Sequence, residues 1–463
     1  MTEAAPRSLW LREALAIEIQ EESLLEGDIG TDVCIVGGGY TGLWTAIRLK
    51  DMDPSLDVVI VEADICGGGA SGRNGGFVLS WWSKFTSLAR LCGAEEALRL
   101  AQASAEAVHE IGEFCSNNGI DARFHEDGYL WAATNKAQLG SWRDTIEELD
   151  RHGLHPFTEL TRQDLLARSG SRVHLGGVLE ASGAIVQPAL LARGLRRVAM
   201  DKGVRIFEGS PMTSLDGRVR TPTGSVAANR IVIAMNAWGV RFSELRRKIL
   251  VVGSDNVATA PIPERLQQTG WRDGLAISDS RLLVHYYRTT DDGRVVFGKG
   301  GGQLAFGPKV GRRFEGNSPR RQSVETAFHA TYPELADVSI EQDWTGPIDR
   351  SRNGLPFFGY LKGRPNVAFG IGYSGNGVGP SFLGGKILAS LALEKEDEWS
   401  GCGLVGIPTK GFPPEPFRYL GGHLVRAAIV REEKAEDKGR RVDPITRGLV
   451  RLAPAGLVPV KGR

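Results

Sequence analysis

The first residues that could do chemistry are three glycines, Gly37, Gly39 and Gly42, in the spacing G-x-G-x-x-G. The apolar run 33–36 before them predicts a buried strand, and apolar residues at helical spacing after them predict a helix. In such a turn the glycines let a pyrophosphate approach the backbone, where free N–H groups at the helix start favour negative charge. Glu62 ends the next apolar run, 20 residues past Gly42, where a carboxylate can accept hydrogen bonds from ribose hydroxyls. The pattern predicts a dinucleotide site; the alternative is an ordinary glycine-rich turn in an α/β sheet.

Two more glycine-rich stretches predict loops that approach another group closely. Residues 63–76 hold too many glycines for a helix, so we expect a loop after the second strand. Residues 370–379 follow an apolar run and precede a helical pattern, so this unit repeats the strand, loop and helix form of the first. We therefore expect one nucleotide domain that begins early, is interrupted, and is completed near residue 395.

The interruption has the pattern of an antiparallel sheet. Residues 251–306 alternate in polarity and contain many turn residues, which favours strands inserted between pieces of the nucleotide domain. We expect an α/β fold: a discontinuous Rossmann-type domain with an inserted antiparallel-sheet α+β substrate domain. The expected parts are an N-terminal arm at 1–30, the nucleotide domain at 31–85, 160–240 and 350–395, the substrate domain at 86–159 and 241–349, and a tail at 396–463.

Composition limits the class of protein. At 463 residues the chain exceeds one typical core, and its formal net charge of +1 gives no field that would recruit nucleic acid. The five cysteines are scattered and form no C-x-x-C pair, which indicates reduced thiols in a cytoplasm rather than disulfides or a metal site. The acidic N-terminus is not typical of a signal peptide, and no apolar run is long enough to span a membrane. We expect a cytoplasmic protein with small-molecule ligands, whose oligomeric state is open.

The motifs together carry a family resemblance. The glycine opening, GASGRNGG at 69–76, IVIAMNAWG at 231–239 and GYSGNGVG at 372–379 resemble, in this order, the flavin-dependent amine and D-amino-acid oxidase (DAO) superfamily. The resemblance covers residues 8–395 and is strongest to the γ-glutamylputrescine oxidase group. It implies FAD rather than NAD, because the late glycine loop can form a second backbone wall against a flavin ring.

The resemblance also implies how FAD is held. No histidine lies in 63–76, so we expect non-covalent FAD, with a structural role for Cys66. The fingerprint turn would hold the pyrophosphate, Glu62 the ribose and the backbone of Met212 the adenine, while the two glycine loops would border the flavin. The residues so implied are Gly37, Gly39, Tyr40, Thr41, Gly42, Glu62, Ala63, Ser71, Gly72, Arg73, Asn74, Gly75, Gly76, Met212, Gly372, Tyr373, Ser374, Gly375, Asn376, Gly377 and Val378.

The candidate catalytic residues belong to the substrate side. Amino-acid-oxidising relatives place a carboxylate-binding arginine after a W-x-G element, but here Ile348 stands at that position with Asp349 beside it. This departure favours an amine whose anionic group lies farther off; Asp349 either attracts the substrate ammonium group or is a turn residue. Arg288, with Tyr287 as a wall residue, could bind the distal anion; a surface strand arginine is the alternative. Strand periodicity allows only one of Tyr286 and Tyr287 to face the site together with Arg288.

The resemblance implies an oxidoreductase of amines. A hydride would pass from the carbon beside a primary or secondary amine nitrogen to FAD, and the imine would hydrolyse to an aldehyde. Reoxidation would use O2, giving hydrogen peroxide, or another acceptor. Lys299 occupies a segment whose counterpart in sarcosine oxidase carries a lysine that assists the oxygen reaction, since positive charge stabilises developing superoxide.

Three alternatives stay open. An α-amino-acid oxidase or dehydrogenase would be favoured if Arg350 or Arg352 faced the flavin. A flavin monooxygenase or halogenase opens with a similar fingerprint, but Gly372-Tyr373-Ser374 stands where such an enzyme would carry a G-D-x motif. A non-catalytic flavin-binding sensor would hold a flavin that no amine reduces.

The tail is basic. Residues 416–463 carry 11 Lys/Arg against 5 Asp/Glu, and apolar residues at helical spacing predict an amphipathic helix. Such a helix can associate weakly with a membrane surface or hold a partner. We favour the simpler alternative, a helix that packs on the protein's own surface.

Overall fold

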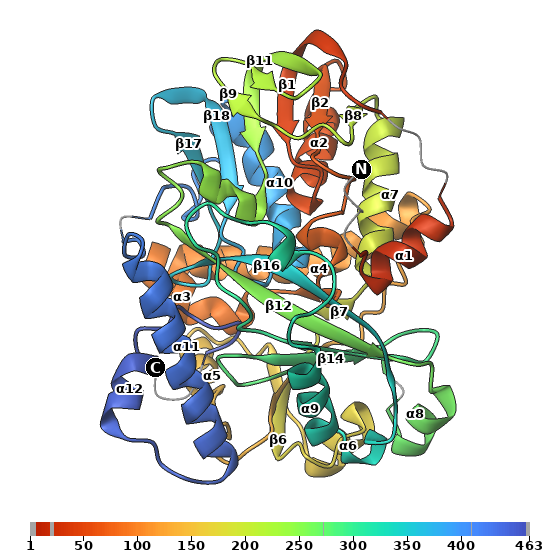
Figure 1. Ribbon diagram of the computed structural model, residues 1–463, viewed down its shortest axis with the longest axis vertical. Coiled ribbons are helices and arrows are strands. Elements are labelled where there is room, and N and C mark those ends of the chain that lie inside the picture. Colours follow the sequence, from red (N-terminus) through yellow and green to blue (C-terminus); the bar gives the residue numbers. More distant parts are fainter. Residues whose placement is uncertain (1–5, 19–22, 272, 409, 460–463) are drawn as a thin grey trace.

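The computed structural model describes residues 6–18, 23–271, 273–408 and 410–459, and has two lobes, each built on an eight-stranded sheet (Figure 1). The strands of the early and late glycine motifs lie together in the upper lobe of the view, and most strands between them form the lower lobe. This arrangement confirms the expected α/β class, with an antiparallel-sheet lobe inserted into a discontinuous nucleotide-binding lobe.

The upper sheet is mainly parallel. In spatial order its strands are β17 (Phe357–Leu361), β18 (Arg364–Ile371), β11 (Gly224–Ile233), β1 (Gly27–Val36), β2 (Val58–Val61) and β8 (Arg205–Phe207), and the short strands β10 (Val219–Arg220) and β9 (Ser214–Leu215) attach to β11. The central strands are continuous apolar runs because the sheet is buried on both faces. β1 pairs in parallel with both β2 and β11, and β11 pairs in parallel with β18. The three glycine motifs, which follow β1, β2 and β18, therefore lie at the same edge of the sheet.

Three helices pack against this sheet and one more against them. They are α2 (Tyr40–Met52), α7 (Pro188–Asp201), α10 (Val378–Ala392) and α1 (Leu9–Ala16). α2 and α10 lie side by side (Figure 1), and Gly385 permits the approach because a Cβ there would lie 2.6 Å from the Cβ of Trp44. Trp10 of α1 packs with Ala189 of α7, so the N-terminal helix is docked on the nucleotide-binding lobe.

The lower sheet is mainly antiparallel. In spatial order its strands are β16 (Ile340–Ser351), β12 (Ile249–Thr259), β15 (Val295–Lys299), β14 (His285–Thr289), β13 (Ala276–Asp279), β4 (Tyr129–Ala133), β6 (Gly176–Glu180) and β5 (Phe157–Glu159). The pair β13 and β4 is parallel. Around this sheet the chain forms α5 (Arg143–Asp150), α6 (Arg162–Ser169), α8 (Pro263–Thr269) and α9 (Arg321–Thr331). The helices α3 (Phe85–Cys92) and α4 (Ala94–Asn117) pack against each other, and α4 also packs against α10 of the upper lobe. A small sheet of β3 (Phe77–Leu79) and β7 (Gly183–Ile185) leads between the lobes.

Strand pairing moves three of the expected domain boundaries. β6 was expected in the nucleotide domain at 160–240, but it pairs with β4, so the chain returns to the upper lobe only after Glu180. β1 begins inside the expected arm, at Gly27, because residues 27–31 pair with β11. β16 crosses the expected boundary between Asp349 and Arg350, because its pairing with β12 continues to Ser351.

The tail forms two helices, α11 (Phe417–Asp437) and α12 (Pro444–Val450), that lie along the lower lobe (Figure 1). Ala428 and Ile429 of α11 pack with Leu283 and Val450 in one apolar cluster. The predicted amphipathic helix is therefore present, and its buried face contacts the protein itself. Within the described residues no helix is long and apolar enough to cross a membrane.

Candidate active site

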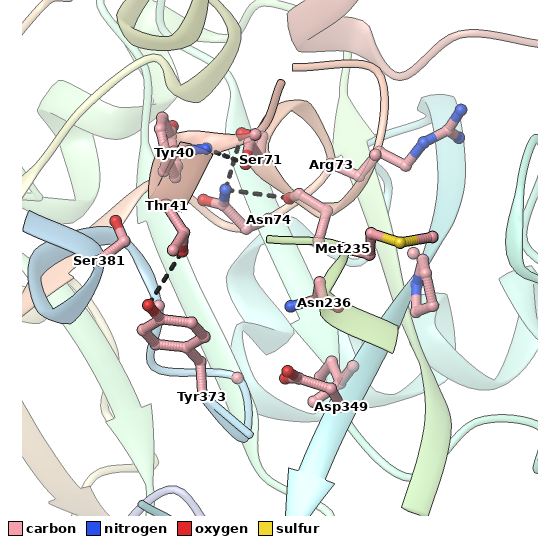
Figure 2. Close-up of a pocket in the computed structure, with 18 of the residues that line it drawn as sticks. Tyr40, Thr41, Ser71, Arg73, Asn74, Met235, Asn236, Asp349, Tyr373 and Ser381 are labelled. Carbon is pink, nitrogen blue, oxygen red and sulfur yellow. Dashed lines mark hydrogen bonds between the residues drawn. The ribbon is translucent and has the colours of Figure 1, made fainter. Parts of the chain in front are cut away.

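The fingerprint turn lies between β1 and α2. Gly37 has φ +113°, and a Cβ at Gly42 would lie 1.9 Å from the carbonyl oxygen of Gly37, so both positions require glycine. The backbone N–H of Tyr40, the first residue of α2, donates to Ser71 Oγ at 3.0 Å (Figure 2). The turn therefore presents the start of α2 to a cavity, as the spacing of the glycines predicted.

Glu62 closes the same edge of the sheet, directly after β2. Its carboxylate accepts hydrogen bonds from the backbone N–H groups of Gly38, at 2.6 Å, and Asp64, at 2.9 Å. Burial raises the pKa of Glu62 to about 7, although these donors oppose the shift. The acid thus lies against the fingerprint turn, where the sequence predicted a ribose-binding group.

A cavity of about 470 Å³ runs from the fingerprint turn to the lower sheet. This size is in the range of small-molecule and cofactor sites. Its lining joins residues of β1, the loop after β2, β16 and the late glycine loop, and Figure 2 shows several of them around one space. The predicted cofactor residues in the lining are Gly37, Gly39, Tyr40, Thr41, Glu62, Ala63, Ser71, Arg73, Asn74, Gly75, Met212, Tyr373, Ser374, Gly375, Asn376, Gly377 and Val378.

The loop after β2 is held by its own side chains. The Asn74 amide donates to the carbonyl oxygen of Ser71 at 2.9 Å, and its Oδ1 accepts from the N–H of Gly76 at 2.7 Å. Arg73 Nε donates to the carbonyl of Gly68 at 3.0 Å. Gly42, Gly72, Gly76 and Gly372 are the predicted cofactor residues that are not in the cavity lining. Their glycine requirement is structural: a Cβ at Gly72 or Gly76 would lie within 2.5 Å of a carbonyl oxygen, and Gly372 has a positive φ.

The late glycine loop is tied to β16 by Asp349. Asp349 Oδ2 accepts from the N–H of Gly372 at 2.5 Å, and burial raises the pKa of Asp349 to about 7. Gly372 and Ser374 have φ +91° and +60°, so the loop turns sharply before α10 begins. Tyr373 reaches back across the cavity, where Thr41 Oγ1 donates to its hydroxyl oxygen at 2.9 Å (Figure 2). Asp349 therefore organises the loop as well as lining the cavity.

Of the other predicted catalytic residues, Tyr287, Arg288 and Lys299 are not among the residues that line the cavity. Tyr287 points into the core of the lower lobe, where its ring stacks on Phe297. Arg288 is buried outside the cavity lining, where its Nη1 donates to the carbonyl oxygen of Val186 at 2.5 Å. Strand periodicity was right that only one tyrosine faces the cavity, and that residue is Tyr286.

Lys299 lies next to the cavity. Its Nζ lies 2.6 Å from His285 Nε2, and the following residue, Gly300, lines the cavity. Burial and the charge of Lys299 lower the pKa of His285 well below its usual value, so the histidine is neutral and can accept from the lysine. The predicted role of Lys299 with O2 stays a prediction.

The sequence prediction missed several lining residues. Met235, Asn236 and Trp238 follow β11, and their signal was the MNAWG segment after a parallel strand, because such strand ends meet at one edge of the sheet. Arg350 was named only for the amino-acid alternative, and Leu457 of the tail was not named at all. Nothing local in the sequence indicates that residue 457 returns to this cavity.

The residues present fit a dinucleotide. Among the described residues, Arg73 Nη1, Asn376 Oδ1 and Asp349 Oδ1 are buried without a hydrogen-bond partner, although buried polar groups are rarely left unpaired. All three side chains line the cavity. The glycine turn at the start of α2 adds the backbone N–H groups that bind a pyrophosphate. The site therefore offers donors and acceptors that a large polar cofactor would satisfy.

This combination defines a dinucleotide-binding protein in which a second, antiparallel lobe walls the same cavity. The sequence profile of the FAD dependent oxidoreductase family matches residues 32–391, so the chain belongs to that family, and FAD is its cofactor. The resemblance to the DAO superfamily is thereby confirmed. The chain is an FAD-dependent oxidoreductase.

Individual relatives agree with the family. The chain is 31% identical to Gamma-glutamylputrescine oxidoreductase of Escherichia coli (strain K12) over 374 residues, which cover 79% of this chain and 84% of that protein. It is 27% identical to Glycine oxidase of Geobacillus kaustophilus over 390 residues, covering 79% of this chain and 93% of that protein. The crystal structure of glycine oxidase from Geobacillus kaustophilus superposes with a TM-score of 0.66 at 20% identity, covering 82% and 99% of the two chains, and supports the fold.

Proposed function

We propose that this protein oxidises the C–N bond of a primary or secondary amine that carries an anionic group away from the reacting carbon. The observation that carries the proposal is the continuity of the cavity: the fingerprint turn and the wall formed by Ile348 and Tyr286 border one space. The relative named Gamma-glutamylputrescine oxidoreductase supports an amine with a distant anion. The absence of an arginine at position 348 agrees with a substrate other than a simple α-amino acid.

The chemistry that bound FAD would supply is acceptance of a hydride from the carbon next to the amine nitrogen. The chain supplies position and environment. Tyr286, whose hydroxyl lies 2.8 Å from Ser254 Oγ, and Ile348 form a wall that excludes water from the substrate side. A buried site of this kind favours the neutral amine, which is the form that can lose a hydride. The side chains of Arg73 and Asn376 and the backbone of 372–378 would hold the cofactor, without a covalent bond.

The test is anaerobic bleaching of the FAD-loaded protein by a panel of amines. We expect γ-glutamylputrescine or another long amine with a distant anion to bleach the flavin, and sarcosine, glycine and D-alanine to do so at least about 10-fold more slowly, since each lacks the distant anion that a charged hydrogen bond would hold. Rapid bleaching by the amino acids would favour the second candidate, an α-amino-acid oxidase or dehydrogenase, which Arg350 in the lining also suits. A flavin that no amine bleaches would indicate a sensor and contradict the proposal.

We further propose that O2 is the acceptor, that hydrogen peroxide is the product, and that Lys299 assists this step. Lys299→Met is expected to slow reoxidation by O2 about 10-fold or more, because a positive charge beside the site stabilises developing superoxide, while anaerobic reduction stays unchanged. Stopped-flow absorbance measures both steps. Lys309→Met, at an exposed lysine, is the control. Equal reoxidation rates in both variants would remove Lys299 from the reaction.

A further inference from the structure

The end of the tail returns to the cavity. Leu457 lines it, although the match to the family profile ends at residue 391. The N–H of Ala455 donates to the carbonyl oxygen of Arg352 at 3.1 Å, so this part of the tail is tied to the chain just after β16. Leu457 and Val458 are buried in the main core of the protein. Leu457 therefore forms part of the wall of the site, and its neighbours in the segment 455–458 hold it there.

The tail helix anchors this wall to the lower sheet. Glu433 of α11 accepts from the N–H of Leu283 at 2.9 Å, and Arg426 Nε donates to the carbonyl of Gly301 at 2.5 Å. Asp437 pairs with Arg281 at 2.7 Å. These contacts bracket Val284, Tyr286 and Gly300, which line the cavity. The tail helix is therefore attached to the lower sheet on both sides of these three lining residues.

Two buried cationic side chains contact the tail segment that contains Leu457. Arg350, which lines the cavity, donates from Nη1 to the carbonyl of Ala455 at 2.7 Å, and Lys84 donates from Nζ to the carbonyl of Gly456. Arg350 is 9% exposed and Lys84 3%. Burial lowers the pKa of Arg350 to about 10 and, together with the charge of Arg350, that of Lys84 to about 7. Among the described residues no carboxylate pairs with either side chain, and uncompensated buried charge is costly.

Since carbonyl dipoles only partly offset these charges, an anion bound at this end of the cavity would stabilise them. We propose that Arg350, held by the tail at Ala455, binds the anionic end of the amine substrate, and that Leu457 packs against the chain between anion and amine. This inference rests on the proposed function and adds the residues that recognise the substrate. Arg350 fits the role because a guanidinium can bind a carboxylate through two parallel hydrogen bonds.

Binding of unreactive ligands tests the subsite apart from catalysis. Hexanoate and hexanamide have the same length and differ in charge, and each is titrated into the FAD-loaded full chain while the flavin absorption spectrum is recorded. In Arg350→Met we expect hexanoate to bind about 10- to 100-fold more weakly, the effect of losing a charged hydrogen bond, and hexanamide to be unchanged. Arg350→Lys should keep part of the preference. Arg352→Met, at an exposed arginine two residues on, is the matched control.

Reactive ligands then give the distance between anion and amine. Glycine, β-alanine, 4-aminobutyrate and 6-aminohexanoate are compared as reductants of the flavin, with hexylamine as the uncharged reference. Wild type should prefer a long member over hexylamine through KM, and Arg350→Met should remove that preference. In the binding titration, Leu457→Trp should weaken hexanoate and leave acetate, a carboxylate without the long chain, unchanged.

The outcomes separate the two proposals. Equal losses of hexanoate and hexanamide in Arg350→Met, or no loss in either, would overturn the anion subsite while leaving amine oxidation intact. Hexanoate binding that depends on Arg350, in a protein whose flavin no amine reduces, would support the subsite and contradict the proposed function. Unchanged binding in Leu457→Trp would overturn the role of the tail as a wall.

Discussion

Gly42→Ala is expected to give a folded protein that purifies without yellow colour. The new Cβ would lie 1.9 Å from the carbonyl oxygen of Gly37 and 3.2 Å from Ile35 Cγ2, so the turn between β1 and α2 must open. The N–H groups at the start of α2 would then move away from the pyrophosphate that they are expected to bind. Loss of two charged hydrogen bonds predicts FAD binding weaker by about 100-fold or more.

A fluorescence titration of the apoprotein with FAD measures the effect, and circular dichroism shows whether the variant has folded. Gly30→Ala is the matched control: it makes the same substitution in β1, and a Cβ there meets nothing within 4 Å. We expect this control to bind FAD as the wild type does. A yellow Gly42→Ala protein with normal affinity would show that the fingerprint turn does not hold the cofactor.

The cofactor half of the site could be predicted from the sequence because its signals are local. The spacing of Gly37, Gly39 and Gly42, with strand, helix and acid in order, defines one turn, and the structure has that turn. The late loop at 372–378 was found for the same reason, since a strand before it and a helix after it repeat the form. A short segment that must approach a ligand closely needs glycine at defined positions, so the sequence of that segment alone is enough to predict it.

The substrate half depends on long-range pairing, and there the sequence was a weaker guide. Periodicity on β14 placed Tyr286 and Arg288 on one face, but which face meets the cavity depends on how β14 pairs with β13 and β15. Arg288 shares that face, but its guanidinium donates to the carbonyl oxygen of Val186 outside the cavity lining. Sharing a face with Tyr286 therefore does not by itself place a side chain in the cavity. No local sequence pattern places Leu457 at the cavity, because its position depends on how α11 and α12 pack on the lower lobe.

Asp349→Asn is expected to raise the reduction potential of bound FAD above pH 7 and to leave it unchanged below. The pKa of Asp349 is raised to about 7 by burial, so the carboxyl is neutral at pH 5.5 and ionised at pH 8.5. A negative charge bordering the cavity opposes the addition of electrons, and its removal is worth on the order of 1–2 kcal/mol, or about 20–40 mV for a two-electron couple. Asparagine keeps an oxygen that accepts from the N–H of Gly372, so the loop is preserved.

Stability gives an independent readout of the same charge. The folded pKa of Asp349 lies above the unfolded value, so the native state binds the extra proton between about pH 4 and 7, and this stabilisation is lost as pH rises through 7. The apoprotein of Asp349→Asn should therefore melt higher than wild type, by a margin that is larger at pH 8.5 than at pH 5.5. Asp343→Asn is the control for the potential, since Asp343 lies on the same strand outside the cavity lining and its Oδ1 accepts from the N–H of Ser318 as an asparagine oxygen could. This variant also removes the ion pair of Asp343 with Arg321 at 3.4 Å, so it removes a charge and a charge partner away from the site. A potential difference that is the same at both pH values would mean that Asp349 acts through the shape of the loop and not through its charge.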